Sequence, residues 1–334
     1  MVKGIKTFFL VFCLSVATAD AYAATATIGV NDPKDIEDES LCIYTPDSVY
    51  EQNRDLVLLF DKLYCYCAQN KFDVDNLPAL LQWQDEYSEE IVEYFDNEYP
   101  ESQHLNVHEK EDTVFNRVLS IYEDGYTTYE MAQYGIVKYD ICMYRHLSAI
   151  NNFMSFNMPD TKVKLFKEEL RCWLEFEEKY RDFCYDIIEV SFWMGSIRSV
   201  SCMYARDEIL EAHFNLYDTD DPISLDNHRE LDISREKAKK SLLNHCRESL
   251  SNISAPDAYS YIDDKENKKA YEKAIARARK SLSQVDGALS KWLRAQKAYT
   301  DEMFPDPDMD IVSRKHVVRC INNLKEIVSD NTQL

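Results

Sequence analysis

Apolar residues recur at steps of three and four along most of the chain, which is the spacing of one face of an α-helix. The first such stretches begin near Leu56 and Leu77, and the second stops at Pro100. A polar segment over residues 101–112 predicts a loop, and the apolar pattern restarts at Val114. The chain has only six glycines. Because hairpin turns of β-proteins draw heavily on glycine, this scarcity also favours helices.

Two longer amphipathic helices are predicted in the second half of the chain. The first covers residues 163–187 and follows a break at Pro159, and the second covers residues 271–299 and stops near Pro305. Each has a narrow apolar stripe with charged residues on its other faces, which is typical of a helix that packs by one side.

The two long helices align on Trp173 and Trp292, and every other matched stripe position is apolar or aromatic in both copies: Val163 with Leu282, Phe166 with Val285, Leu170 with Leu289, Phe176 with Ala295 and Tyr180 with Tyr299. Cys202 and Cys320 follow their tryptophans at offsets of 29 and 28 residues. This indicates an internal duplication with a period near 119 residues. The alternative is that any two amphipathic helices align on their stripes.

These patterns predict an all-α fold, a duplicated and disulfide-stabilised bundle of long antiparallel amphipathic helices. We expect a signal peptide over residues 1–23, a polar lead-in and helical region over 24–105, a first helical unit over 106–225 and a degenerate second unit over 226–334.

The N-terminus has the pattern of an export signal. Lys3 and Lys6 precede an apolar run over residues 8–16, and a small-residue motif ends at Ala23, after which we expect cleavage. The sequence therefore predicts a periplasmic or extracellular protein. No later segment approaches the roughly 20 apolar residues that span a bilayer, so we expect no membrane insertion.

Nine cysteines follow the predicted cleavage point: Cys42, Cys65, Cys67, Cys142, Cys172, Cys184, Cys202, Cys246 and Cys320. In an exported protein most of them are expected in disulfides, and the odd count leaves at least one outside an intrachain pair.

The chain carries 60 acidic and 38 basic residues, a net charge of −22. A surface so negative repels phosphates, so nucleic acid and anionic lipid are poor partners, whereas a basic protein is attracted. The alternative is that the acidity only keeps an exported protein soluble.

Residues 170–211 resemble the LprI-like family of exported helical domains, which is named for a lysozyme inhibitor. Its pattern is matched here by Leu170, Trp173, Arg181, Asp182, Cys184, Gly195, Ser196, Cys202, Arg206 and Leu210. In the second copy Trp292 and Cys320 match the tryptophan and the second cysteine of the pattern. Met303 replaces the first cysteine, and the Gly-Ser turn is missing.

The motif has the character of a scaffold. Trp173 would anchor a helix contact, Gly195 would permit a turn, and a disulfide between Cys184 and Cys202 would join two helices at a gain of about 3 kcal/mol. The resemblance implies binding to a basic lysozyme-type glycosidase. The alternative is a cell-envelope binding or scaffolding module that recognises peptidoglycan, a glycan or another envelope protein.

Candidate chemistry is sparse. His104 and His108 have a metal-binding spacing only in a helix, and the predicted loop makes them surface residues. The aspartates at 218, 220 and 221 and at 306, 308 and 310 lack the remaining ligands of an EF-hand, which favours solvated acidic loops. Phosphate-loop and hydrolase motifs are missing. We therefore expect a binding protein rather than an enzyme, with no cofactor and no metal.

Overall fold

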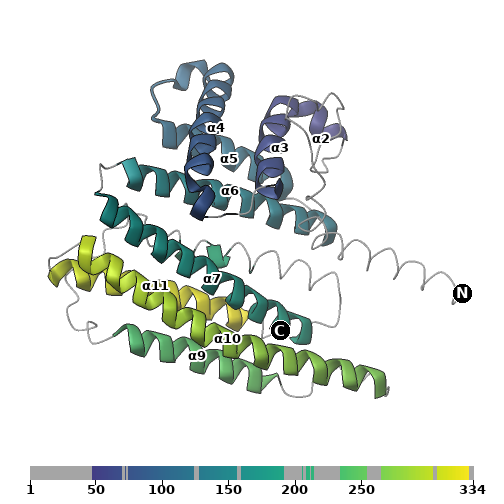
Figure 1. Cartoon of the computed structure of the whole chain (residues 1–334). Helices are drawn as coiled ribbons and strands as arrows, with labels where there is room; N and C mark the ends of the chain where they lie inside the picture. Colours follow the sequence, from purple (N-terminus) through teal and green to yellow (C-terminus); the bar gives the residue numbers. More distant parts are fainter. Residues whose placement is uncertain are drawn as a thin grey trace, which may run out of the picture. The chain divides into compact units, whose positions relative to one another are not determined.

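The computed structural model describes residues 47–330, except 70–71, 73, 124–127, 156–158, 192–204, 206–207, 211, 214–233, 254–264 and 304–306. Within this part of the chain all regular structure is helical, which confirms the all-α fold class (Figure 1). The elements are α2 (Asp47–Gln52), α3 (Arg54–Gln69), η2 (Val74–Asn76), α4 (Leu77–Glu98), η3 (Pro100–Ser102), α5 (Val107–Glu123), α6 (Thr128–Ser155), α7 (Asp160–Ser191), α9 (Arg235–Asn252), α10 (Lys265–Met303) and α11 (Pro307–Asp330).

The chain divides into two compact units. The first comprises Met1–Phe72 and Gln82–Asp124, and the second comprises Asp73–Leu81 and Gly125–Leu334. The core of the first unit consists of apolar side chains from α3, α4 and α5, among them Phe60, Leu63, Ile91 and Phe115. The Tyr87 hydroxyl donates a hydrogen bond to the carbonyl of Leu59 (3.0 Å), which ties α4 to α3 inside this core.

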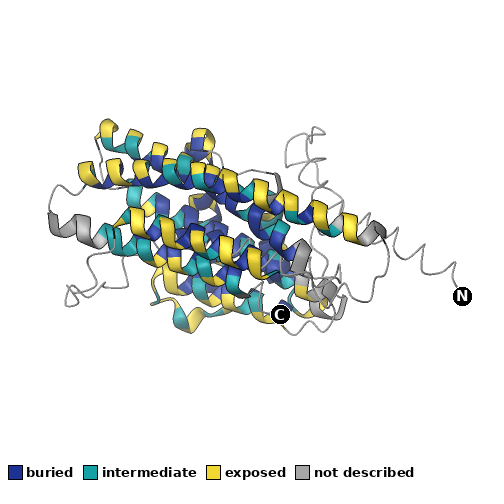
Figure 2. Ribbon diagram, turned by 90° about the horizontal axis from the view of Figure 1, so that it is seen from below, coloured by how far each residue is buried: buried dark blue, intermediate teal, exposed yellow. Residues whose placement is uncertain are grey.

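The second unit is organised around α7 and α10, which pack along their length. Phe166 lies against Tyr299, Trp173 against Trp292, and Asp186 accepts a hydrogen bond from Ser281. In these contacts the residue numbers rise along α7 and fall along α10. The two helices are therefore antiparallel, as expected. Their facing sides are buried and their outer sides exposed (Figure 2).

Helices α9 and α11 complete this bundle, and their mutual orientation departs from the expected antiparallel one. Ser241 lies 3.1 Å from the Lys325 ammonium, and His245 lies 2.9 Å from the Ser329 hydroxyl, so the two helices run in the same direction. Both run opposite to α10, since Lys239 pairs with Asp286 (2.8 Å) while Arg235 reaches Gln296 (2.9 Å).

Three helix boundaries lie close to where the prolines of the sequence predict them: α4 ends at Glu98, α7 begins at Asp160 and α10 ends at Met303. Helix α7 begins directly after Pro159, whose carbonyl accepts from the backbone N–H groups of Lys162 and Val163. The loop predicted over residues 101–112 is wrong in its second half, because α5 begins at Val107. Asn106 and Glu109 form a reciprocal capping box there, with each side chain accepting from the other's backbone N–H. Asp308 and Asp310 likewise belong to α11 rather than to a loop.

Several predictions concern residues outside the described part of the chain. These are the export signal, Cys42, the aspartates at 218, 220, 221 and 306, and the motif residues Gly195, Ser196, Cys202 and Arg206. Most cysteines were expected in disulfides, but six of the described ones are not in any: Cys67, Cys142, Cys172, Cys184, Cys246 and Cys320. The predicted Cys184–Cys202 disulfide is therefore not formed in this structure. None of the described helices is long and apolar enough to span a membrane.

The predicted duplication and its domain limits also stay predictions. The proposed boundary at residue 106 places α5 with the following helices, whereas α5 packs in the first compact unit.

The packing of α7 against α10 predicts a large cost for truncating Leu170, which is completely buried. Leu170→Ala should lower the free energy of unfolding by about 2–5 kcal/mol, because the lost contacts leave a cavity. Leu174→Ala is the matched control, since Leu174 lies one turn away on the same helix and is partly exposed. Equal losses for the two variants in denaturant unfolding would contradict this packing.

Candidate functional site

Six of the predicted motif residues lie in the interior of the second unit: Leu170, Trp173, Cys184, Leu210, Trp292 and Cys320. Asp182 is exposed, and the Arg181 guanidinium pairs with Glu177 one turn away (2.7 Å). The described motif residues thus lie mainly in the protein interior rather than on a binding surface.

The two tryptophans that the sequence alignment pairs meet at the contact between α7 and α10. Trp173 and Trp292 are both fully buried, and their rings form an edge-to-face pair with centroids 4.9 Å apart. Trp173 also stacks on His213 (4.2 Å), and Trp292 stacks on Phe176 (5.5 Å). Edge-to-face and offset aromatic pairs contribute beyond the area they bury, so this cluster fixes how the two helices meet.

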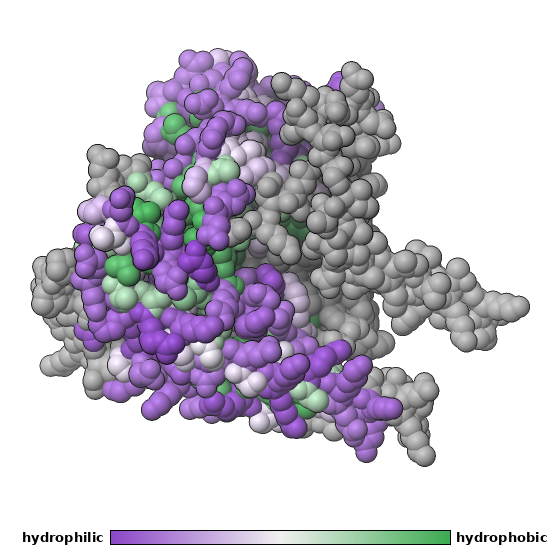
Figure 3. Space-filling model, in the orientation of Figure 1, coloured by the Kyte–Doolittle hydropathy of each residue, from purple (hydrophilic) through white to green (hydrophobic). Residues whose placement is uncertain are grey.

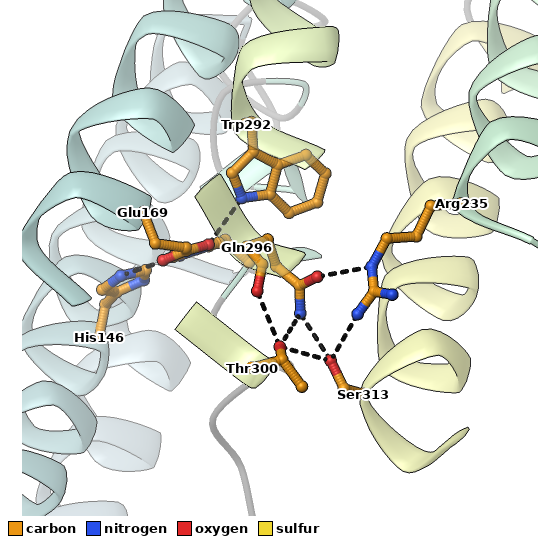
Figure 4. Close-up of polar contacts among 8 residues, drawn as sticks. His146, Glu169, Arg235, Trp292, Gln296, Thr300 and Ser313 are labelled. Atoms are coloured by element: carbon orange, nitrogen blue, oxygen red, sulfur yellow. Dashed lines mark hydrogen bonds and ion pairs between the residues drawn. The ribbon is translucent and has the colours of Figure 1, made fainter. Parts of the chain in front are cut away.

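A buried carboxylate, Glu169, lies beside this aromatic cluster (Figure 4). The Trp292 indole N–H donates to Glu169 Oε1 (2.6 Å), and His213 Nε2 lies 3.4 Å from the same oxygen. His213 Nδ1 in turn lies 3.3 Å from His146 Nε2. The chain Trp292–Glu169–His213–His146 therefore joins α10, α7, the segment around residue 213 and α6.

This polar chain is closed to solvent, because Glu169 and His213 are 0% exposed and His146 is 2% exposed. Burial lowers the pKa of His146 well below its usual value, and the neighbouring His213 lowers it further. In this state the cluster offers no surface to a substrate. The cluster is a structural polar core in which His146 resists protonation.

This cluster was not predicted from the sequence, although one residue of it carries a signal. Glu169 lies three residues after Phe166 and four before Trp173, so it occupies the buried face of an otherwise apolar stripe. A charge at such a position needs a partner, and only the folded chain shows that the partners are Trp292 and His213.

A second polar network joins α9, α10 and α11 (Figure 4). Gln296 accepts from the Arg235 guanidinium (2.9 Å) and donates to the hydroxyls of Thr300 (3.1 Å) and Ser313 (2.7 Å). Thr300 is 1% exposed and its hydroxyl also donates to the Gln296 carbonyl (2.8 Å). Its members satisfy one another, so the network ties α10 to α9 and α11 without offering a reactive group.

The buried cysteines have the environment of unreactive thiols. Burial raises the pKa of Cys246 to about 12 and also raises the pKa of Cys320. A thiol acts as nucleophile or metal ligand only as thiolate, so these two are packing residues here. The described residues also hold no cluster of histidine, cysteine and acidic side chains that suits a metal.

An open groove on the first unit is the best candidate for a binding surface. It is lined by Ser88, Glu89, Val92, Glu93, Asp96 and Asn97 of α4 and by Val107 at the start of α5. Val107 is 52% exposed, which is unusual for a large aliphatic side chain in a described helix here.

The groove is shaped by contacts between α4 and α5. The capping box at Asn106 starts α5 at Val107 and so presents this side chain at the groove. The Ser88 hydroxyl donates to Glu111 (2.6 Å), and the nearly buried Lys110 ammonium pairs with Asp96 (2.6 Å). Glu89 and Glu93 are exposed and make no hydrogen bond or ion pair with other described residues.

Comparison of the chain with protein-family models, curated proteins and solved structures finds no match. The resemblance to the LprI-like family therefore stays an expectation that rests on the motif alone.

The hydrogen bond to Glu169 predicts unequal costs for two chemically identical substitutions. Trp292→Phe removes the donor to a buried carboxylate, whereas the Trp173 indole N–H has no hydrogen-bond partner among the described residues. Both side chains are fully buried. Trp292→Phe should therefore cost about 1–3 kcal/mol more unfolding free energy than Trp173→Phe. Equal costs in denaturant titrations would refute the role of this bond.

The lowered pKa of His146 predicts that the second unit loses stability on acidification. Because the unfolded chain takes up this proton near the ordinary value of 6.5 and the folded chain resists it, the contribution is present above that pH. Below it, stability should fall by about 1.4 kcal/mol per pH unit. His146→Gln should flatten the dependence of unfolding free energy on pH between 7 and 5 by about this slope.

The control for this experiment is His104→Gln, which replaces an exposed histidine of the first unit. If both variants changed the slope equally, burial of His146 would not be the cause.

Proposed function

We propose that this chain is an exported acidic binding protein whose groove on α4 and α5 engages a basic polypeptide, with a lysozyme-type glycosidase as the sharpest candidate. The observation that carries the proposal is the pair Glu89 and Glu93. The two carboxylates lie one helical turn apart along the groove, and neither has a partner cation within the described chain.

The charge around the groove supports a cationic partner. Residues 82–124 contain 13 acidic residues and two basic ones. Both basic residues are already engaged, Lys110 with Asp96 and Arg117 with the Tyr99 hydroxyl (2.7 Å). Like charges four residues apart destabilise a helix by roughly 0.2–0.5 kcal/mol, so a bound cation would relieve a local repulsion.

The apolar part of the groove narrows the partner further. Val107 and the partly exposed Val92 lie among the carboxylates. A partner segment with an apolar residue between lysines or arginines would fit this groove. The apolar side chain would cover the two valines, and the basic side chains would pair with Glu89 and Glu93. Complementary charge would speed the encounter, and the apolar contact would resist salt.

The target class rests on two further points. The predicted export signal places the chain where it would meet enzymes that attack the cell wall, and the LprI-like resemblance implies a lysozyme-type partner. A cell-envelope binding module without inhibitory activity is the competing function.

The test is a titration of the purified chain into a basic lysozyme, with muramidase activity measured at low and at physiological salt. We expect stoichiometric inhibition at both. Glu89→Gln with Glu93→Gln should weaken binding at least about tenfold, which corresponds to about 1.4 kcal/mol.

Glu248→Gln with Glu326→Gln is the matched control, because it removes the same charge from exposed positions on α9 and α11. It should leave affinity nearly unchanged. An equal loss in both double variants would show that only net charge matters. Absence of inhibition at either salt would leave the competing envelope function.

A further inference from the structure

The charge of this chain is divided very unevenly along its length. The first 234 residues contain 45 acidic and 19 basic residues, whereas residues 235–334 contain 15 acidic and 19 basic ones. The strongly negative total thus conceals a slightly positive C-terminal part. The repulsion of anionic partners that follows from the net charge therefore does not apply to residues 235–334 by themselves.

The basic residues concentrate on the first half of α10. Between Lys265 and Lys280 the helix carries seven basic and two acidic residues. Five of the cations are exposed and have no hydrogen bond or ion pair with other described residues: Lys268, Lys269, Lys273, Arg279 and Lys280. We call these five residues the basic ridge. Arg277 is not included, because it reaches Asp186 (3.6 Å).

The ridge is held rigidly by the opposite face of the same helix. Ala274, Ala278 and Leu282 are buried, and the Tyr271 hydroxyl donates to the carbonyl of Ile253 (2.8 Å). The apolar side of α10 therefore packs inside the bundle, and it is not available for insertion into the apolar interior of a membrane. From Lys268 to Lys280 the ridge extends about 18 Å along the helix.

Part of the ridge lies beyond the end of α7. Since Asp186 of α7 contacts Ser281 of α10 and α7 ends at Ser191, the antiparallel register carries the first turns of α10 beyond the end of α7. Figure 1 shows the greener end of α10 continuing past the last turn of α7. The surface over this part of the bundle is predominantly hydrophilic (Figure 3).

We propose that the basic ridge docks the protein on an anionic phospholipid surface. The five cations lie on the exposed side of α10, and a helix side rich in positive charge is attracted to a plane of negative headgroups. Lysine, which supplies four of the five, is a compact point charge suited to mobile headgroups, whereas arginine favours fixed bidentate sites. The positive end of the α10 dipole lies at the same end of the helix.

The docking is peripheral and electrostatic. Each lysine or arginine near such a surface contributes about a fivefold gain in partitioning, and the effect decays within a Debye length of about 8 Å at physiological salt. Exposed Glu272 lies among these cations, and the five basic side chains keep a local excess of positive charge over it within that distance.

The test is co-sedimentation of the purified full chain with vesicles of neutral phosphatidylcholine and with vesicles containing an equal amount of anionic phosphatidylglycerol. We expect binding to the anionic vesicles that falls steeply with salt. The neutral vesicles correct for any binding by the apolar run over residues 8–16. Lys268→Gln, Lys273→Gln and Lys280→Gln together should weaken anionic partitioning by about 100-fold.

The matched control replaces Lys62, Lys291 and Lys297 by glutamine, which removes the same charge from exposed lysines outside the ridge. It should keep most of the binding. Equal losses in the two triple variants, or no preference for anionic over neutral vesicles, would overturn the proposal. Binding to soluble polyphosphate without binding to vesicles would also overturn it. Neither result depends on lysozyme inhibition, so the two proposals fail separately.

Discussion

Burial of the Glu169 carboxylate constrains the whole second unit. Removing such a charge from water costs several kcal/mol even after relaxation. That cost is tolerable only where donors reach the carboxylate, and here the Trp292 indole (2.6 Å) and His213 (3.4 Å) do so. Because these donors lie on α10 and near residue 213, α7 can bury Glu169 only in the register that brings Trp292 opposite. Apolar stripes alone would permit a slip of one helical turn, whereas this bond does not.

The same register decides what the ends of the bundle present. Helix α10 has 39 residues and α7 has 32, and the pairing of Trp173 with Trp292 leaves the first turns of α10 without α7 beside them. Lys268, Lys269 and Lys273 of the basic ridge lie at that end. A buried polar contact in the middle of the bundle therefore determines which surface residues project from it, although the two sites share no side chain.

The sequence predicts helices well because stripe residues such as Leu170 and Trp173 report directly on burial, and because Pro159 ends a helical pattern in any context. It predicts sites less well, because partners are set by packing. The sequence does not distinguish Glu169 from the nearby acidic residues whose side chains are solvated. No local pattern links it to His213 or His146. The capping box at Asn106 and Glu109 was present in the sequence, yet its polar composition resembles a loop, so the start of α5 and the exposed Val107 beside the groove were missed.

The range over which net charge guides the choice of partner is limited by screening. A total of −22 governs encounters at long range and at low salt, where it favours a basic protein. At physiological salt the interaction range shrinks to about 8 Å, and local sets of charges then act independently. Glu89 and Glu93 on α4 and Lys268 to Lys280 on α10 are two such sets of opposite sign. The partners proposed for the groove and for the ridge have opposite charges, and interactions of this short range are compatible with both proposals.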